Sequence, residues 1–405
     1  MRPRPLALAT VGLALISAML AAPVGAIGDS YSLTDLGTLG GSSSTAIKVS
    51  NAGSVIGQAM LADGTSHGFI WRDGQLTDLG TLGGRLSQAE ALSELDHVVG
   101  SSQTADGVSH AFLWQQGRMT DLGALGGSWS AAADVNGLGQ VVGAAQTQDG
   151  SMHAVLWSDG RATDLGTLGG DRSVANAINE HGQITGQATT ASGAQHAFLW
   201  QAGQMIDLGT LGGGYSFPAG VTEEGWVVGS SAVPGGATHV FIWKDGAMTD
   251  LGPAGGSSLA EAQAAGLIAG RVSTSGDPPR AALWSGGGLI ELGTLGHATS
   301  SATDVSQAGT VIGVSTTPMG EVGQADRRPF LWRGGVMADL ATLVTNGTGW
   351  RLEAELAGSI NANDWIVGSA IGPDGVRAVL LRPTPATTLV PAADPATTLA
   401  PVAAP

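Results

Sequence analysis

The chain of 405 residues lacks cysteine, and it is poor in lysine and arginine. Without cysteine it can form no disulfide, no thiolate zinc site, no iron–sulfur cluster and no cysteine nucleophile. Its 17 Lys and Arg against 33 Asp and Glu give a net charge of −16, so the clustered basic surface of a nucleic-acid-binding protein is missing. Neither of its two lysines, Lys48 and Lys244, follows a glycine, which excludes a P-loop.

Charged residues and long hydrophobic runs are also scarce. Only 12% of residues are charged, but 43% are apolar, which is not the composition of a disordered chain. The 65 glycines follow no triplet period, so collagen is excluded. No stretch of about 18 apolar residues follows residue 26, and we therefore expect no membrane span in the mature protein.

The first 26 residues have the pattern of a secretory signal peptide. Arg2 and Arg4 precede an apolar run over residues 6–20, and Val24-Gly25-Ala26 forms a small-residue cleavage site. A membrane anchor is the rival interpretation, but the run is short and has no stop-transfer flank. We therefore expect residues 1–26 to be removed and the mature protein to be secreted.

The other end of the chain has a different composition. Residues 383–405 are rich in Pro, Ala and Thr, and the block Pro-Ala-Thr-Thr-Leu begins at both Pro385 and Pro395. Such a segment cannot bury a core or hold a regular ladder of hydrogen bonds. We expect a disordered or extended tail here.

Between these ends, residues 27–382 repeat one unit of about 43 residues. The phrase Asp-Leu-Gly, or a variant of it, begins at Asp35, Asp78, Asp121, Asp164, Asp207, Asp250, Glu291 and Asp339. A phrase Val/Ile-x-Gly ends at Gly57, Gly100, Gly143, Gly186, Gly229, Gly270, Gly313 and Gly368. A third phrase ends at Trp71, Trp114, Trp157, Trp200, Trp243, Trp284, Trp332 and, in degenerate form, Leu381. A period of this length indicates a solenoid or a propeller.

Each unit divides into four short runs separated by turn residues. In the first unit the runs cover residues 46–50, 55–60, 67–71 and 75–79, and Asn-Ala-Gly or Asp-Gly turns separate them. Such runs predict four antiparallel strands, whereas no stretch has a sustained helical period. Four strands in each of eight units predict an all-β, eight-bladed β-propeller.

The ends of the array indicate how the ring closes. A lone fourth strand over residues 31–36 comes before the first complete unit, and the last unit has three strands and no fourth. The N-terminal strand can therefore complete the last blade and remove two open sheet edges. A ring of seven units with one unpaired unit remains the alternative.

The three phrases resemble the repeats of the bacterial extracellular HAF-repeat family. The name fits His110-Ala111-Phe112 and His196-Ala197-Phe198, and the resemblance covers roughly residues 31–382. It implies a secreted repeat protein with a propeller-like fold, and it implies no particular activity or ligand.

One repeat position holds a histidine in five units and an arginine in three. These residues are His67, His110, His153, His196, His239, Arg280, Arg328 and Arg377. They could form a ring that binds an anion or metals. We favour a structural role, because each His shares its unit with an Asp of the fourth strand, and Arg can replace His as the donor to that carboxylate. Repetition also spreads these side chains around the axis, whereas metal ligands must converge.

Ligand binding is expected where the repeat is broken. The connections that lead into each first strand, with two longer segments near the end of the array, carry exposed aromatic and basic residues that suit sugar stacking or a protein interface. The candidates are Arg85, Trp129, Arg172, Tyr215, Phe217, His297, Arg327, Trp350 and Arg351.

These observations favour a secreted, non-enzymatic scaffold. We expect a monomer without metal or cofactor that binds an extracellular glycan or protein on one propeller face. One alternative is a polysaccharide lyase or hydrolase that uses Glu321, Asp326, Glu353 and Glu355, with Arg327 or Arg351 holding an anionic substrate. Another alternative is a purely structural surface or matrix protein with the tail as its tether.

Overall fold

The computed structural model describes residues 30–274, 276–296, 298–316, 326–352 and 354–384. These residues form 32 β-strands and two short 3₁₀ helices, η1 (Leu340–Leu343) and η2 (Ala354–Leu356). The fold is therefore all-β, as the repeats predict. The expected signal peptide and residues 385–405 lie outside the described residues.

The strands group in fours, and each group is one sequence repeat. Unit 1 is β2 (Gly40–Val49), β3 (Val55–Leu61), β4 (Ser66–Arg72) and β5 (Gln75–Asp78). Unit 2 is β6 (Gly83–Leu92), β7 (Val98–Thr104), β8 (Ser109–Gln115) and β9 (Arg118–Asp121). Unit 3 is β10 (Gly126–Val135), β11 (Val141–Thr147), β12 (Met152–Ser158) and β13 (Arg161–Asp164). Unit 4 is β14 (Gly169–Ile178), β15 (Ile184–Thr190), β16 (Gln195–Gln201) and β17 (Gln204–Asp207).

The later repeats follow the same plan. Unit 5 is β18 (Ser216–Val221), β19 (Val227–Ala232), β20 (Thr238–Lys244) and β21 (Ala247–Asp250). Unit 6 is β22 (Ser257–Ala264), β23 (Leu267–Ser273), β24 (Arg280–Ser285) and β25 (Gly288–Gly293). Unit 7 is β26 (Thr299–Val305), β27 (Val311–Thr316), β28 (Arg327–Arg333) and β29 (Val336–Asp339). The closing unit is β30 (Ser359–Ile360), β31 (Ile366–Gly372), β32 (Gly375–Thr384) and β1 (Ser30–Asp35).

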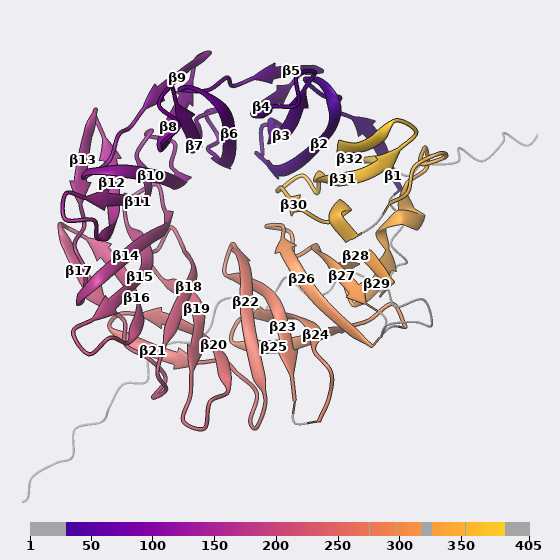
Figure 1. Ribbon diagram of the computed structural model, residues 1–405. Coiled ribbons are helices and arrows are strands. Elements are labelled where there is room, and N and C mark those ends of the chain that lie inside the picture. Colours follow the sequence, from indigo (N-terminus) through magenta and orange to yellow (C-terminus); the bar gives the residue numbers. More distant parts are fainter. Residues whose placement is uncertain (1–29, 275, 297, 317–325, 353, 385–405) are drawn as a thin grey trace, which may run out of the picture.

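The units stand side by side around a ring (Figure 1). Within each unit, neighbouring strands pair antiparallel, and the first strand lies nearest the axis while the fourth lies at the rim. Single parallel bridges, Ser66 to Leu86 and Met152 to Arg172, join two pairs of units into eight-stranded sheets. A ring of radial antiparallel sheets is the arrangement of a β-propeller.

The ring has two edges with different turns. The chain enters each inner strand at one edge, which we call the entry edge, and this edge also carries the turns from second to third strands, such as Asp63-Gly64. The opposite edge carries the turns from inner to second strands, such as Asn51-Ala52-Gly53. Because the strands alternate in direction, equivalent turns of all units lie on the same edge.

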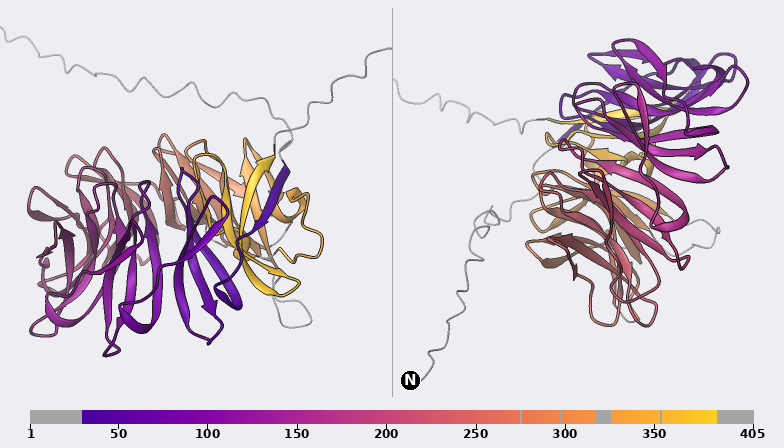
Figure 2. Two further views of the ribbon diagram at one scale, coloured as in Figure 1. Left: turned by 90° about the horizontal axis from the view of Figure 1, so that it is seen from above. Right: turned by 90° about the vertical axis from the view of Figure 1, so that its left-hand side faces the viewer.

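The N-terminal strand completes the closing unit, as the sequence predicts. Strand β1 pairs antiparallel with β32 from Ser30–Thr384 to Asp35–Val379, and the two strands lie side by side in Figure 2. Tyr31 is fully buried by this pairing. The pairing also moves one expected boundary, because Pro383 and Thr384 belong to β32 rather than to the tail.

The inner strands start earlier than the sequence predicts. Strand β2 begins at Gly40, six residues before the expected start at Ala46. The register of β2 against β3 shifts twice, between Gly40 and Ser44 and between Ala46 and Lys48. These irregularities interrupt the period-2 pattern of the side chains, so the sequence pattern predicts a loop over the first half of the strand.

The apolar core lies between neighbouring units rather than inside any one of them. Ile56 and Ile70 of unit 1 pack with Ala89 and Leu92 of unit 2 in one such cluster. The same arrangement recurs where the chain ends meet, because Val367 of the closing unit packs with residues of unit 1. Burying one large apolar side chain contributes about 1.5–3 kcal/mol, so each unit depends on both neighbours for its stability.

The repeated Val/Ile-x-Gly phrase has a steric cause. A Cβ placed on Gly57 would lie 2.0 Å from the carbonyl oxygen of Thr45 and 2.8 Å from the ring of Phe69. Only glycine leaves room for the inner strand on one side and the buried phenylalanine on the other.

Candidate functional site

The repeated histidines belong to a hydrogen-bond network that joins adjacent units. In unit 2, His110 Nδ1 lies 2.9 Å from Asp121 Oδ2, and the N–H of Gly123 donates to Asp121 Oδ1 at 2.7 Å. Ser130 of unit 3 donates its hydroxyl to the Gly123 carbonyl at 2.7 Å and accepts the N–H of Ala111 at 2.8 Å. The network therefore explains the Asp-Leu-Gly and His-Ala-Phe phrases as parts of one junction.

The same His–Asp contact occurs in all five units that carry a histidine. The distances from Nδ1 to the nearer carboxylate oxygen are 2.8–2.9 Å for His67–Asp78, His110–Asp121, His153–Asp164, His196–Asp207 and His239–Asp250. Within the described part of the chain, no group of three or more His, Asp or Glu side chains is placed to hold a metal ion. The recurring His–Asp contacts are consistent with a structural role for this position.

The three arginines at this position behave differently from one another. Arg328 reaches Asp339 of its own fourth strand at 3.2 Å, so it replaces histidine as the donor. Arg280 donates to the carbonyl of Ala298, and Arg377 donates to the carbonyl of Ser42 in unit 1. The eight residues therefore do not form a uniform cationic ring.

The sequence interpretation missed the serine of this network. Ser44, Ser87, Ser130, Ser173 and Ser216 recur at intervals of 43 residues, which was the available signal. These buried hydroxyls lie in the inner strands and accept N–H groups of the preceding unit. The repeat of a small polar residue draws less attention than a repeated Trp or His.

Four of the nine candidate binding residues lie in inner strands rather than in the connections before them, which corrects the sequence interpretation. Arg85 lies in β6, Trp129 in β10, Arg172 in β14 and Phe217 in β18, while Tyr215 directly precedes β18. All are near the entry edge. His297 lies outside the described residues.

Two of these residues stack on each other at the start of the inner strand of unit 5. The rings of Tyr215 and Phe217 stack with their centroids 5.1 Å apart, and Tyr215 Oη bonds to Thr238 Oγ1 at 2.7 Å. Phe217 faces Ser230 across the strand pair. Both rings are half-buried, so they serve as packing for unit 5 as well as a partly exposed apolar surface.

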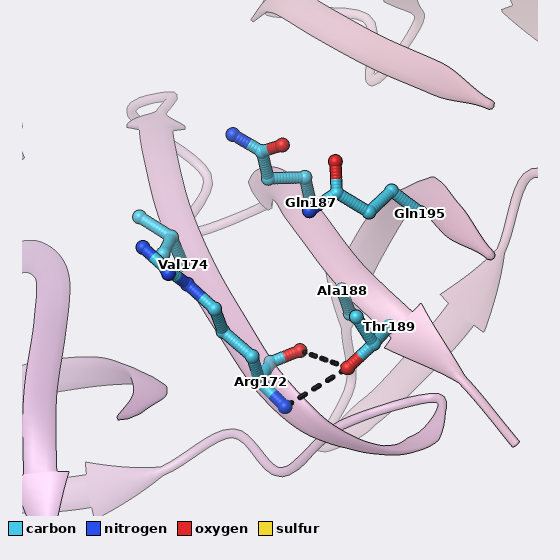
Figure 3. Close-up of a pocket in the computed structure, with 6 residues that line it drawn as sticks. All are labelled: Arg172, Val174, Gln187, Ala188, Thr189 and Gln195. Carbon is cyan, nitrogen blue, oxygen red and sulfur yellow. Dashed lines mark hydrogen bonds between the residues drawn. The ribbon is translucent and has the colours of Figure 1, made fainter. Parts of the chain in front are cut away.

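Unit 4 has a pocket at the equivalent place, where Arg172 and Val174 stand in the repeat positions of Tyr215 and Phe217. A pocket of about 230 Å³ is lined by Arg172, Val174, Gln187, Ala188, Thr189 and Gln195. Figure 3 shows the Arg172 side chain running alongside Val174 while the Gln187 and Gln195 side chains approach from the neighbouring strands. The main chain of Arg172 is fixed to Thr189 Oγ1 by two hydrogen bonds, of 2.9 and 3.0 Å.

Arg85 lies in the inner strand of unit 2, in another part of the ring. Hydrogen bonds from Thr65 lower the pKa of Asp63 in unit 1, and the positive charge of Arg85 adds to this effect. Arg85 is therefore placed next to the turn of the preceding unit. It lies at the entry edge but does not belong to the unit 4 pocket.

The two segments that interrupt the repeat carry surface ion pairs. Arg327 lies 3.2 Å from Glu355, and Arg328 lies 3.1 Å from Asp326, with all four side chains about half exposed. Glu321 and Glu353 lie outside the described residues. The described carboxylates of the proposed acid–base set are thus each paired with an arginine rather than with each other.

Trp350 and Arg351 have local structural roles. Trp350 packs against the core cluster between unit 7 and the closing unit, and its ring lies where a Cβ on Gly372 would be 2.8 Å away. The main chain of Arg351 bonds in both directions to Ile371, at 2.8 and 3.1 Å. Trp350 is half-buried in the core, which weakens its candidacy as a stacking platform.

Two half-buried carboxyl groups in the inner strands, Asp134 and Asp304, escaped the sequence interpretation. Asp134 Oδ2 accepts the N–H of Ile178 in the next unit at 3.0 Å, and Asp304 Oδ2 accepts that of Ile360 at 3.0 Å. Burial raises the pKa of both groups, and the charge of Lys48 opposes this rise in each. The repeat pattern gave no signal for them, because Ala91 and Ala177 occupy the same position in units 2 and 4.

Comparisons with known proteins give a distant structural likeness and no family. No protein-family model matches the chain, and no curated protein matches it in sequence. A puromycin-hydrolysing peptidase of Mycobacterium tuberculosis is 13% identical with a TM-score of 0.47, and the match covers 82% of this chain. The chain spans 57% of the length of that peptidase.

Other similar structures have different reported roles. The BP39L lectin of Burkholderia pseudomallei is 13% identical with a TM-score of 0.37, covering 87% of this chain and 94% of the lectin. TolB of Acinetobacter baumannii is 13% identical with a TM-score of 0.37, covering 62% of each chain. Likenesses this distant carry no argument about function. Among the residues described, no helix is long and apolar enough to cross a membrane.

Proposed function

We propose that the protein is a secreted, eight-bladed β-propeller of the HAF-repeat type that binds an extracellular glycan through its entry edge. The eight repeats and the pairing of β1 with β32 support the blade count. The N-terminal 26 residues support secretion, and the three recurring phrases support the family.

One observation carries the binding proposal. Trp129, Arg172 and Tyr215 occupy the same repeat position, immediately before the network serine, in three consecutive units. Equivalent positions of neighbouring units lie next to each other around a propeller, so an aromatic, a cationic and a second aromatic side chain follow one another along the entry edge. Aromatic faces and polar groups in alternation suit a chain of sugar rings.

The other side of the ring differs at this position. Ser43, Ser257 and Thr299 replace the large side chains in units 1, 6 and 7. The repeat tolerates small residues there, so packing does not require Trp or Arg. A surface asymmetry on a symmetric scaffold indicates where a ligand is bound.

The test is a binding screen on the mature chain that starts at residue 27. Neutral and acidic bacterial and plant polysaccharides are scanned by thermal shift, since a ligand specific for the folded state raises the melting temperature. We expect a hit that Trp129→Ala or Arg172→Ala abolishes and that Arg118→Ala, a charge removal on the opposite edge, leaves intact. A panel without a single hit contradicts glycan binding, and a hit equally sensitive to Arg118→Ala contradicts its placement at the entry edge.

A further inference from the structure

The cross-strand pair that follows the network serine differs among units 3 to 6. The paired residues are Ala131 and Ala144, Val174 and Gln187, Phe217 and Ser230, and Leu259 and Arg271. In unit 5 the Phe217 ring stacks on Tyr215. Unit 4 leaves a pocket of about 230 Å³ and unit 6 one of about 50 Å³.

The lining of the unit 4 pocket points to an anionic ligand. The Arg172 side chain is exposed and makes no hydrogen bond or ion pair with the residues that the structure describes. None of the six lining residues is acidic, although Asp171 accepts a hydrogen bond from the lining residue Thr189. The protein has a net charge of −16, yet the Arg172 guanidinium beside this pocket has no partner among the described residues. Such an arginine is suited to bind an anion.

The remaining groups suit the hydroxyls of a sugar. Gln187 and Gln195 each offer an amide that can both donate and accept hydrogen bonds, and Val174 supplies an apolar wall. The volume lies below the roughly 300–1,000 Å³ of pockets for drug-sized ligands, which fits a single ring better than a larger molecule.

We propose that this pocket holds one uronic acid residue of an acidic glycan, with its carboxylate paired to the Arg172 guanidinium. The inference rests on the proposed glycan-binding function and specifies its substrate class. The planar guanidinium matches a carboxylate with two parallel hydrogen bonds, and the glutamines bind the ring hydroxyls. Neighbouring sugars of the chain extend along the entry edge toward Trp129 and Tyr215.

A nearby carboxylate sharpens the proposal. Asp171 lies on the pocket rim, where its Oδ1 is 3.2 Å from Thr189 Oγ1. Its negative charge opposes a bound uronate. Asp171→Asn therefore increases the affinity for the acidic sugar, and it leaves a neutral sugar unaffected.

The chain offers two matched variants. Arg172→Tyr combined with Val174→Phe copies the residues of unit 5, so it closes the pocket with a packing that this fold already contains. Arg271→Ala removes an arginine from the smaller pocket of unit 6, where Arg271 is likewise exposed and without a partner among the described residues. It controls for the loss of one positive charge.

The experiment measures binding of sodium glucuronate, oligogalacturonate, glucose and a neutral glucan to the mature protein by calorimetry and ligand-observed NMR. We expect the two acidic probes to bind. Arg172→Ala should weaken their binding about 10- to 100-fold, and so should the plugged double variant, Arg172→Tyr with Val174→Phe. Arg271→Ala is expected to leave both affinities unchanged, and circular dichroism confirms that each variant is folded.

The outcomes separate this inference from the proposed function. Neutral glucan binding equal to that of oligogalacturonate overturns the uronate assignment and leaves glycan binding intact. Acidic sugar binding that survives the plugged double variant places the site elsewhere on the ring. No binding of any probe, combined with no hit in the polysaccharide panel, overturns both.

Discussion

The junctions between successive units of the ring fall into two kinds. Seven of them contain the network serine, whose hydroxyl accepts a main-chain N–H of the preceding unit at 2.8–3.0 Å. One of the seven is the seam where the two ends of the chain meet, with Ala378 donating to Ser44. The junction from unit 7 to the closing unit has no such bond.

The junction lacks the bond because unit 7 has no N–H donor and the closing unit has no serine acceptor at the repeat positions. The N–H donor in the other units follows the His or Arg position, but in unit 7 this residue is Pro329, which has no N–H. The closing unit in turn has no serine at the acceptor position, and η2 takes the place of the start of its inner strand. Leu340 and Leu356, both fully buried, fill the junction with apolar contacts. Donor and acceptor are absent together, so neither is left buried without a partner.

The comparison shows that the seam is a regular junction and that the irregular one lies elsewhere. Asn361 also donates to the Ser50 carbonyl across the seam at 2.8 Å, just as Asn179 donates to Thr222 between units 4 and 5 at 2.8 Å. Closure of the ring therefore uses the repeat's own contacts. The insertions near the end of the chain interrupt one junction without opening the ring.

The prediction with the largest expected effect concerns the junction where the two ends of the chain meet. Deletion of residues 27–39 removes β1, and with it the burial of Tyr31, Leu33 and Leu36. At about 1.5–3 kcal/mol for each side chain, the loss is comparable to the whole stability of a typical domain. We expect the truncated protein to lose its cooperative urea transition. Addition of a peptide of residues 27–39 in trans restores the transition, whereas a truncated monomer of unchanged stability contradicts the role of β1.

A smaller test removes one network serine. Ser130→Ala leaves the buried N–H of Ala111 without its acceptor, which costs about 1–3 kcal/mol. Ser128→Ala is the matched control on the same strand, because Ser128 is exposed and bonds only to Gln146. We expect Ser128→Ala to change the free energy of unfolding by no more than about 0.5 kcal/mol. Equal urea midpoints for the two variants would show that the network serine does not stabilise the junction.

The repeat could be read from the sequence because its chemistry recurs at a fixed spacing. The strand pattern, the His–Asp pairs and the role of β1 all depend on residues such as His110 and Asp121 that appear in most units. What the sequence did not reveal depends on single positions. Asp134 and Asp304 are half-buried in inner strands, where desolvation raises their pKa values, and Trp350 of one insertion packs against the core.

The pocket of unit 4 illustrates the same limit. Arg172 is a candidate because its repeat position varies among the units. Nothing in the sequence indicates that Val174 and Gln187 leave a pocket beside it. That space depends on the aromatic rings of unit 5 being absent from unit 4, which becomes visible only when equivalent strand pairs are compared in three dimensions.

A pH-dependent test concerns the carboxyl group of Asp134. Burial raises the pKa of Asp134 above its usual value of 3.8, so below that pH the group is protonated in both the folded and the unfolded chain and costs nothing. As the pH rises through the folded-state pKa, the group must ionise in a poorly solvated place, and stability is lost. Asp134→Asn should therefore be more stable relative to the wild type at pH 7 than it is at pH 3. Urea unfolding at both pH values measures this difference, and any weakening of the hydrogen bond from Ile178 that is the same at both pH values cancels from it.

The smallest effect belongs to the surface of the irregular junction. Arg327 and Glu355 lie on opposite sides of it, 3.2 Å apart and more than half exposed. An exposed ion pair contributes about 0–1 kcal/mol, and salt screens it. We expect Arg327→Ala and Glu355→Gln each to change the urea midpoint by less than Ser130→Ala does, with the difference disappearing in 0.5–1 M salt (about a 3–4 Å Debye length). A double-mutant cycle with a coupling energy as large as the serine effect would mean that the irregular junction relies on this pair rather than on Leu340 and Leu356.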